Sequence, residues 1–216
     1  MQKWNIAYRI NSQYDFTPII INLENVERDP KVKFIKKQLL EEEHHPLPKN
    51  LKIAIIDFKG SPVFMCGIMI QNIIFTYYIE EWCHKIKFYK LIFNVLQLAK
   101  DLTFFAFSNY ERIKLLNMYH YLQVQGDYVS EFSFIKEFPI INLQKENYRY
   151  ESLTEAFYSI NPNSAILTGD SLFRNNKLVN QLFNAQKFDE IISHNRNCLL
   201  NESLLFQKRW YKNYKL

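Results

Sequence analysis

Two short apolar runs limit the folds open to this chain more than any other feature of its sequence. Residues 51–58 read Leu-Lys-Ile-Ala-Ile-Ile-Asp-Phe, and residues 103–107 read Thr-Phe-Phe-Ala-Phe. Runs of this length and composition are typical of strands that are buried on both faces of a sheet. The first run delivers Asp57 at its end, and Glu111 follows the second. We therefore expect a central strand over residues 51–58, flanked by strands over residues 63–70 and 103–107.

The remaining periodic segments give the order of the elements after this central strand. In chain order they predict strands over residues 63–70 and 73–78, a helix over 80–101, a strand over 103–107, a helix from Ser108 or Asn109, a strand over 138–143 and helices from residue 152 onward. The helix predictions depend on apolar residues at helical spacing, and the strand predictions on short apolar or alternating runs. This order predicts an α/β fold with a mixed sheet flanked by helices.

The N-terminal part of the chain has a different pattern. Residues 1–26 alternate in places between polar and apolar side chains, which indicates a hairpin or two short strands. A helix is expected over residues 29–43, because its first two residues, Asp-Pro, are a common helix start. We therefore expect a small N-terminal extension over residues 1–48 and one domain over residues 49–216.

Composition limits the expected partners and cellular location of the protein. The net charge of +5 permits binding to nucleic acid but does not require it. The three cysteines are widely spaced and form no Cys-x-x-Cys pair, so neither a zinc motif nor a disulfide framework is indicated. We find no secretory signal pattern, and no apolar run approaches the roughly 20 residues that a membrane span needs. A cytoplasmic, intracellular protein without a membrane partner is expected.

Four segments carry a resemblance to a known superfamily. They are Ile-Ala-Ile-Ile-Asp-Phe-Lys at residues 53–59, Phe-Ala-Phe-Ser-Asn-Tyr-Glu-Arg at 105–112, Ile-Ile-Asn-Leu at 140–143 with Ser-Leu at 152–153, and Ile-Ile-Ser-His-Asn-Arg-Asn-Cys-Leu at 191–199. They are similar, in order, to a strand ending in Asp-x-Glu, a strand leading into Tyr-Gly-x-Tyr-Glu, an apolar-Asp-Leu strand before a Ser-Leu-Lys helix start, and a Tyr-Asn-x-x-Asp motif. Over residues 51–210 the chain thus resembles the ribonuclease H-like DEDD 3′–5′ exonuclease superfamily, in particular the ribonuclease H-like domain of the predicted RecB-type nuclease group.

The resemblance implies a ribonuclease H-like fold and a site for two Mg²⁺ or Mn²⁺ ions about 4 Å apart, held by acidic side chains. Only Asp57 and Glu111 match acidic positions of the family pattern. The Glu of Asp-x-Glu is replaced by Lys59, and the Asp of the third strand by Asn142. Both residues also have structural explanations that need no active site. Aspartate is common in turns, which could explain Asp57, and the helix dipole favours a carboxylate such as Glu111 at a helix start.

The closing motif has lost its carboxylate as well. Its Asp falls on Cys198, or on Asn197 if the register shifts by one residue. His194 is a candidate general base near the former site, and the alternative is a purely structural histidine. For Cys198 the alternative is that it packs in the core as a small hydrophobic side chain. Since Lys59 repels a divalent ion and can replace it beside Asp57, we expect weak metal binding at most. If the resemblance holds, Asp57, Lys59, Glu111 and one of Asn197 or Cys198 converge on a single cleft at one end of the sheet.

The C-terminal segment mixes cationic and aromatic side chains at Lys208, Arg209, Trp210 and Lys212. Cationic groups can hold phosphates while aromatic rings stack on bases, a combination that suits single-stranded nucleic acid. The alternative is a solvated helix end whose Lys and Arg complement the helix dipole.

The expected function is that of a degenerate exonuclease-like domain, a pseudonuclease, which binds single-stranded DNA or RNA, or a protein partner, in a nucleic-acid processing system. One alternative is an active, metal-dependent 3′–5′ exonuclease that uses Asp57, Glu111 and a further carboxylate such as Asp170 or Glu202. A second alternative is a non-catalytic scaffold subunit whose apolar and aromatic surface forms an interface. No cofactor is expected in the degenerate domain, and Mg²⁺ or Mn²⁺ in an active one.

Overall fold

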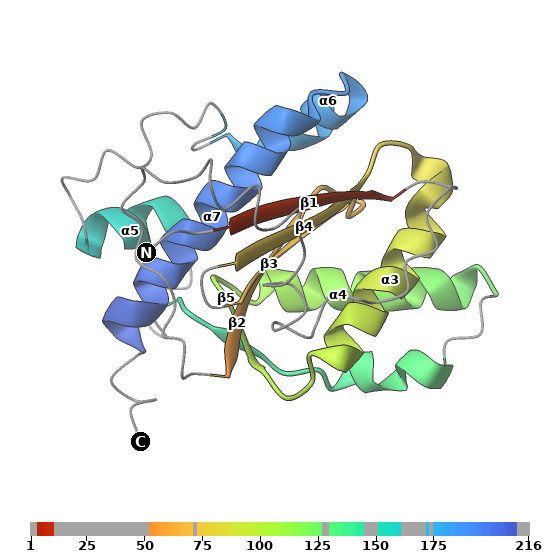
Figure 1. The fold of residues 1–216 in the computed structure, drawn as a ribbon, viewed down its shortest axis with the longest axis horizontal. Coiled ribbons are helices and arrows are strands. Elements are labelled where there is room, and N and C mark those ends of the chain that lie inside the picture. The colour runs from red at the N-terminus through yellow and green to blue at the C-terminus, as the bar shows by residue number, and fades with distance from the viewer. Residues whose placement is uncertain are drawn as a thin grey trace.

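A six-stranded mixed sheet forms the centre of the protein in the computed structural model (Figure 1). The structure describes residues 4–10, 52–70, 73–126, 130–144, 151–160, 172 and 175–210. Its elements are β1 (Trp4–Ile10), β2 (Ile53–Lys59), β3 (Met65–Ile70), β4 (Ile73–Ile79), the 3-10 helix η1 (Trp82–His84), α3 (Lys85–Leu98), β5 (Thr103–Ala106), α4 (Tyr110–Val124), the 3-10 helix η2 (Ser130–Lys136), β6 (Ile140–Asn142), α5 (Leu153–Ile160), the 3-10 helix η4 (Asn176–Leu178), α6 (Val179–Asn184) and α7 (Phe188–Arg209).

The strand order is β1-β4-β3-β2-β5-β6. β2 is antiparallel to β3 and parallel to β5, β3 is antiparallel to β4, and β5 is parallel to β6. The strand predicted from residues 51–58 therefore lies inside the sheet between the two predicted neighbours, and that prediction is confirmed. The expected α/β class, with a mixed sheet flanked by helices, is also confirmed.

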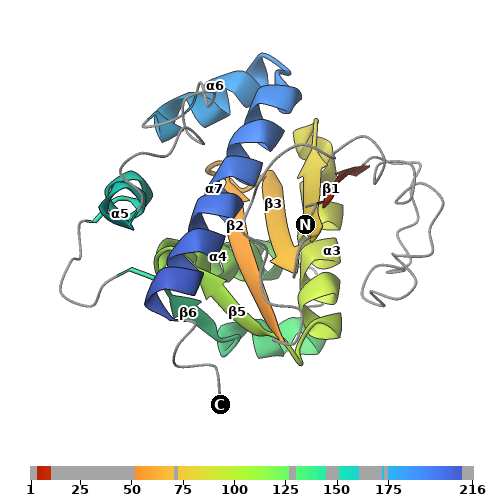
Figure 2. The ribbon, with the colours of Figure 1, turned by 60° about the vertical axis from the view of Figure 1, so that its left-hand side comes forward.

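Helices cover both faces of the sheet. Figure 2 shows α7 crossing one face, while α3 and α4 lie on the other. β2 is buried along its whole length because its side chains alternate between these two layers. Ala54 and Ile56 belong to the large cluster that includes α3 and α4, whereas Ile53 and Ile55 pack in a second cluster with Leu199 of α7. The same alternation directs Asp57 toward α7. In the described part of the chain, we find no helix long and apolar enough to cross a membrane.

The described part of the N-terminal segment belongs to the main sheet. Residues 4–10 form a single strand, β1, that pairs in parallel with β4 and so enlarges the main sheet. The predicted helix over residues 29–43 lies outside the described residues. The helix predicted over residues 80–101 is present in shorter form, because the chain first makes the 3-10 turn η1 and then forms α3.

Gly67 of β3 allows α7 to lie close to the sheet. Gly67 is paired in register with Asp57. An ideal Cβ placed on it would lie 2.1 Å from Asn195 Oδ1 and 2.7 Å from Leu199 Cδ1. Both neighbours are completely buried, and Asn195 is also hydrogen-bonded to Asp57, so neither can move aside freely. A side chain at this position would therefore push α7 away from β2.

We expect Gly67→Ala to lower the free energy of unfolding by about 2–3 kcal/mol, because extra atoms in a close-packed core force its neighbours to shift. Urea unfolding followed by circular dichroism measures this change. Gly126→Ala is the matched control: its φ of +73° strains an alanine, but a Cβ there would meet nothing within 4 Å. We expect that control to lose only about 1 kcal/mol. Equal losses in the two variants would show that the approach of α7 does not depend on Gly67.

Candidate functional site

A cleft of about 370 Å³ lies where the carboxyl end of β2 meets the start of α4. Its charged and aromatic lining residues are Asp57, Phe58, Lys59, Tyr110, Glu111, Lys114 and Lys177. These residues come from β2, α4 and the 3-10 helix η4, which are far apart in the sequence. Because β2 and β5 are parallel neighbours, the segments that follow them leave the sheet at the same edge. Asp57, Lys59 and Glu111 therefore converge on one cleft, as the motif spacing predicted.

Lys59 forms a buried ion pair at the base of this cleft. Its Nζ lies 2.9 Å from Asp57 Oδ2 and donates a hydrogen bond to Cys198 Sγ at 3.1 Å. The side chains of Lys59 and Asp57 are only 8% and 7% exposed. Burial on its own lowers the pKa of Lys59, but the attraction of Asp57 and then of Cys198 outweighs burial, so the pKa is raised. Lys59 is thus an ammonium at neutral pH.

Helix α7 supplies the other partners of this pair. Asn195 Nδ2 donates to Asp57 Oδ2 at 2.6 Å and to the Asp57 main-chain oxygen at 3.3 Å. Cys198 follows three residues later and therefore shares a helix face with Asn195. The closing motif thus contacts Lys59 of the cleft through Cys198, while the alternative, Asn197, is half-buried. His194 is buried one turn earlier, with its Nε2 3.8 Å from Cys198 Sγ.

Glu111 lies in the first turn of α4 and is 6% exposed. Ser108 Oγ donates to its Oε2 at 3.3 Å. Burial, followed by repulsion from Asp57, raises the pKa of Glu111 to about 7, while Lys114 and Lys59 oppose the rise. Glu111 is therefore partly protonated at neutral pH, which is unusual for a carboxyl group and reduces its capacity to hold a cation.

Lys114 lies on α4 one turn after Tyr110. Its Nζ donates a hydrogen bond to the main-chain oxygen of Phe58 and lies 4.6 Å from the centre of the Tyr110 ring. Burial lowers the pKa of Lys114, although attraction to Glu111 and Asp57 opposes the shift. The cleft therefore has a second amine, positioned between the sheet and an exposed aromatic ring.

Glu202 adds a third carboxyl group to the surroundings of the cleft. It is 2% exposed, and its Oε2 accepts no hydrogen bond within the described part of the chain. Burial, and then repulsion from Asp57 and Glu111, raises its pKa well above the ordinary value. The sequence offered Glu202 only as an alternative ligand. Its position four residues after Cys198 places it on the helix face that meets the cleft, and this spacing is the signal that would have identified it.

The other predicted site residues have different surroundings. Asn142 ends β6, and its Oδ1 accepts a hydrogen bond from the main-chain nitrogen of Gln144 at 2.8 Å. This contact closes the local turn after the strand. Asp170 lies outside the described residues.

The basic and aromatic C-terminal residues are divided between internal and exposed positions. Arg209 forms a bidentate ion pair with Glu151 at 2.7 and 2.8 Å and donates to the Leu143 main-chain oxygen at 3.2 Å. The Trp210 ring packs 6.3 Å from that of Phe105. These two side chains hold the end of α7 against the sheet.

Lys208, in contrast, is exposed, and Lys212 lies outside the described residues. The structure therefore gives Arg209 and Trp210 partners within the protein. Nucleic-acid binding by the C-terminal segment stays a prediction.

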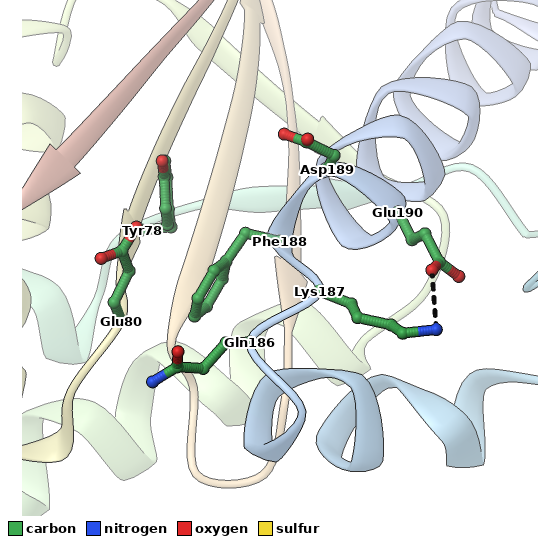
Figure 3. Close-up of a pocket in the computed structure, with 7 residues that line it drawn as sticks. All are labelled: Tyr78, Glu80, Gln186, Lys187, Phe188, Asp189 and Glu190. Carbon is green, nitrogen blue, oxygen red and sulfur yellow. Dashed lines mark ion pairs between the residues drawn. The ribbon is translucent and has the colours of Figure 1, made fainter.

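A second hollow of about 330 Å³ lies between the end of β4 and the start of α7 (Figure 3). The Tyr78 and Phe188 rings, 5.6 Å apart, form its aromatic part, and Lys187 pairs with Glu190 at 3.4 Å. The remaining lining residues are Glu80, Gln186 and Asp189. No predicted site residue lies in this hollow.

The side chains of the cleft do not fit a pair of divalent ions. Asp57 Oδ2 already accepts from Lys59 and Asn195, so this oxygen is occupied by two protein donors. Glu111 and Glu202 have raised pKa values, and Lys59 is close enough to act on both, while Lys114 also acts on Glu111. A two-ion site needs ionised carboxylates and little competing positive charge.

The raised pKa of Glu111 predicts a fall in stability as pH rises. Near pH 4.5, its ordinary value, the unfolded state begins to ionise, whereas the folded state retains its proton up to about pH 7. The folded state binds more protons in this window, so unfolding becomes easier with increasing pH. Relative to Glu111→Gln, the wild type should therefore lose about 3 kcal/mol of unfolding free energy between pH 4.5 and 7.5.

Urea unfolding at several pH values measures this difference. Glu137→Gln is the control, because Glu137 is exposed and its removal should leave the wild-type profile unchanged. If the wild type and Glu111→Gln gave parallel profiles over this range, the assigned environment of Glu111 would be wrong.

Comparisons with family models, characterised proteins and solved structures give no match to the chain.

Proposed function

We propose that the protein is a degenerate ribonuclease H-like domain that binds single-stranded nucleic acid in this cleft without cutting it. The observation that carries the proposal is the Lys59 ammonium, paired with Asp57 at 2.9 Å where the family pattern has a second acidic residue. The domain keeps the shape of a nuclease site but fills its metal position with a side chain.

The order of the elements supports the family resemblance. From β2 onward, three strands, a helix, a strand, a helix, a strand and further helices follow one another as the resemblance implies. The two motif strands, β2 and β5, are adjacent and parallel, and the closing motif on α7 contacts the first motif through Asn195 and Cys198. Three of the four motif segments therefore meet at this end of the sheet, while Asn142 of the remaining motif makes a local contact with Gln144.

Electrostatics supports the loss of cleavage. A divalent ion about 4 Å from the Lys59 ammonium would be repelled by about 8 kcal/mol at an effective dielectric constant of ~20. Such a penalty weakens metal binding by several orders of magnitude. The other acidic residue of the cleft, Asp57, is already paired with Lys59, and Glu111 is partly protonated at neutral pH.

Binding without cleavage is supported by the rim of the cleft. Tyr110 is 52% exposed, and both Lys114 and the exposed Lys177 line the same cleft. An exposed aromatic ring can stack on a base of any sequence, and amines beside it can contact the flanking phosphates. This combination favours a single strand, whose bases are free to stack, over a duplex.

We expect Tyr110→Ala to weaken binding to single-stranded oligonucleotides about tenfold, because one lost stacking contact costs ~1–3 kcal/mol. Fluorescence anisotropy with labelled DNA and RNA strands measures the affinity. Val124→Ala is the control, since Val124 lies on the last turn of the same helix and is 82% exposed. Lys177→Ala should reduce the steepness with which the logarithm of the binding constant falls against the logarithm of the salt concentration. The slope should change by about 0.7, the value for one phosphate contact on a single strand.

Lys100→Ala is the matched lysine control, because Lys100 is exposed and precedes β5, at the edge of the sheet opposite the cleft. Absence of salt-dependent binding to any strand would contradict the proposal and favour the scaffold subunit. Binding that Tyr110→Ala and Lys177→Ala leave unchanged would place the nucleic acid elsewhere on the protein.

A second candidate function, an active metal-dependent 3′–5′ exonuclease, is favoured by one observation. Glu202 is a buried carboxyl group close to Asp57 and Glu111 whose Oε2 has no hydrogen-bond partner among the described residues. With this group, a third carboxyl group lies near the two that line the cleft.

We expect the purified protein to show no nuclease activity on single-stranded DNA or RNA with Mg²⁺ or Mn²⁺, because Lys59 neutralises Asp57. Cleavage assays compare the wild type with Asp57→Asn, Glu202→Gln and Lys59→Glu. Wild-type cleavage that disappears in Asp57→Asn and Glu202→Gln would overturn the pseudonuclease proposal and establish the enzyme. Lys59→Glu need not restore activity, since Asn142 and Cys198 also replace acidic residues.

A further inference from the structure

Three side chains of different chemistry meet on one turn after β4. Glu81 directly precedes the 3-10 helix η1, which contains Cys83 and His84. One carboxylate oxygen, the Cys83 sulfur and a His84 ring nitrogen all lie within 4.8 Å of one another. Cys83 Sγ donates to Glu81 Oε2 at 3.3 Å, and His84 Nε2 lies 4.0 Å from the same oxygen. None of these residues lines the cleft.

The spacing of these atoms suits a small tetrahedral ion. Zinc binds sulfur at ~2.3 Å and nitrogen or oxygen at ~2.0–2.2 Å, so its ligands in tetrahedral geometry are about 3.3–3.7 Å apart. The sulfur–oxygen separation of 3.3 Å lies at the lower end of this range, and the nitrogen–oxygen separation of 4.0 Å lies above it. Small rotations of the exposed Glu81 and Cys83 side chains and of the half-buried His84 ring, which move their ligand atoms by a few tenths of an ångström, would therefore bring the three ligands to bonding distance.

The backbone that carries the ligands is held by the core. The Trp82 ring, between Glu81 and Cys83 in sequence, packs 4.6 Å from the Phe183 ring and 6.1 Å from that of Phe64. The main-chain nitrogen of His84 donates a hydrogen bond to the main-chain oxygen of Glu81 at 3.2 Å. Binding an ion would thus require ordering of side chains only, which reduces its entropic cost.

The nearest cation along the chain is also fixed. Lys85 Nζ lies 3.7 Å from the centre of the Tyr121 ring and 5.9 Å from that of Trp82. These contacts with aromatic faces hold the ammonium.

On metal binding, the Cys83 thiol would release its proton to solvent as the metal–sulfur bond forms, giving two negative ligands and one neutral imidazole.

We propose that Glu81, Cys83 and His84 bind one zinc ion, with water as the fourth ligand. The thiolate and imidazole select zinc over Mg²⁺ and Ca²⁺, which prefer oxygen ligands throughout. This site is separate from the nucleic-acid cleft, and its existence does not depend on the proposed function.

Cobalt(II) in place of zinc is the probe, because a cobalt–thiolate bond gives a charge-transfer absorption that oxygen and nitrogen ligands do not. The full chain, kept reduced with a phosphine, should bind one equivalent of cobalt, and zinc should displace it. Cys83→Ser should abolish the charge-transfer band. His84→Gln and Glu81→Gln should each weaken zinc binding at least about tenfold, a loss of ~1.4 kcal/mol or more. Mg²⁺ should not compete.

Two controls separate this turn from other ligands. Cys198→Ser tests the buried thiol beside His194, and His120→Ala tests an exposed histidine on α4. Both should retain one equivalent of metal and the band. The proposal is overturned if the band is absent from the wild type, or if it survives Cys83→Ser and disappears in Cys198→Ser.

Discussion

The buried ion pair between Lys59 and Asp57 is the interaction on which the cleft depends. Each charge alone would cost several kcal/mol to remove from water, so the pair requires further hydrogen bonds to be stable. Those bonds come from Asn195, which donates to Asp57, and from Cys198, which accepts from Lys59. Because both partners belong to α7, the pair is complete only when this last helix lies across β2. The central strand and the C-terminal helix are therefore coupled, and Gly67 provides the space that this contact needs.

Local sequence pattern was sufficient for the central strands and for two acidic residues of the cleft. Strands buried on both faces need unbroken apolar side chains, which is why the segments before Asp57 and Glu111 could be recognised. The contact between Lys59 and Cys198 could not be read in the same way, because the register of α7 against the sheet is a long-range property. Glu202 was weighed only as an alternative, since a glutamate in a helix is ordinarily exposed and its burial depends on the same docking.

Side-chain chemistry alone was a poorer guide at both ends of the chain. Arg209 and Trp210 are residue types that suit binding to single-stranded nucleic acid. In the structure, however, the Arg209 guanidinium pairs with Glu151 and the Trp210 indole packs near Phe105. The alternating N-terminal pattern indicated strands but not their partner. Pairing of β1 with β4 joins residues nearly 70 positions apart (Trp4 with Ile73), and no local pattern reports such a contact.

The pairing of β1 with β4 also decides which strand borders the sheet. β4 reads Ile-Ile-Phe-Thr-Tyr-Tyr-Ile, and an edge of this composition would expose backbone groups beside an apolar, uncharged segment. Segments of this kind are templates for pairing with a second copy and for cross-β assembly. With β1 in place, the border is Trp-Asn-Ile-Ala-Tyr-Arg-Ile, which contains a cation at Arg9. Loss of residues 4–10 to a protease would therefore leave the cleft residues in the chain and yet give the protein an aggregation-prone edge.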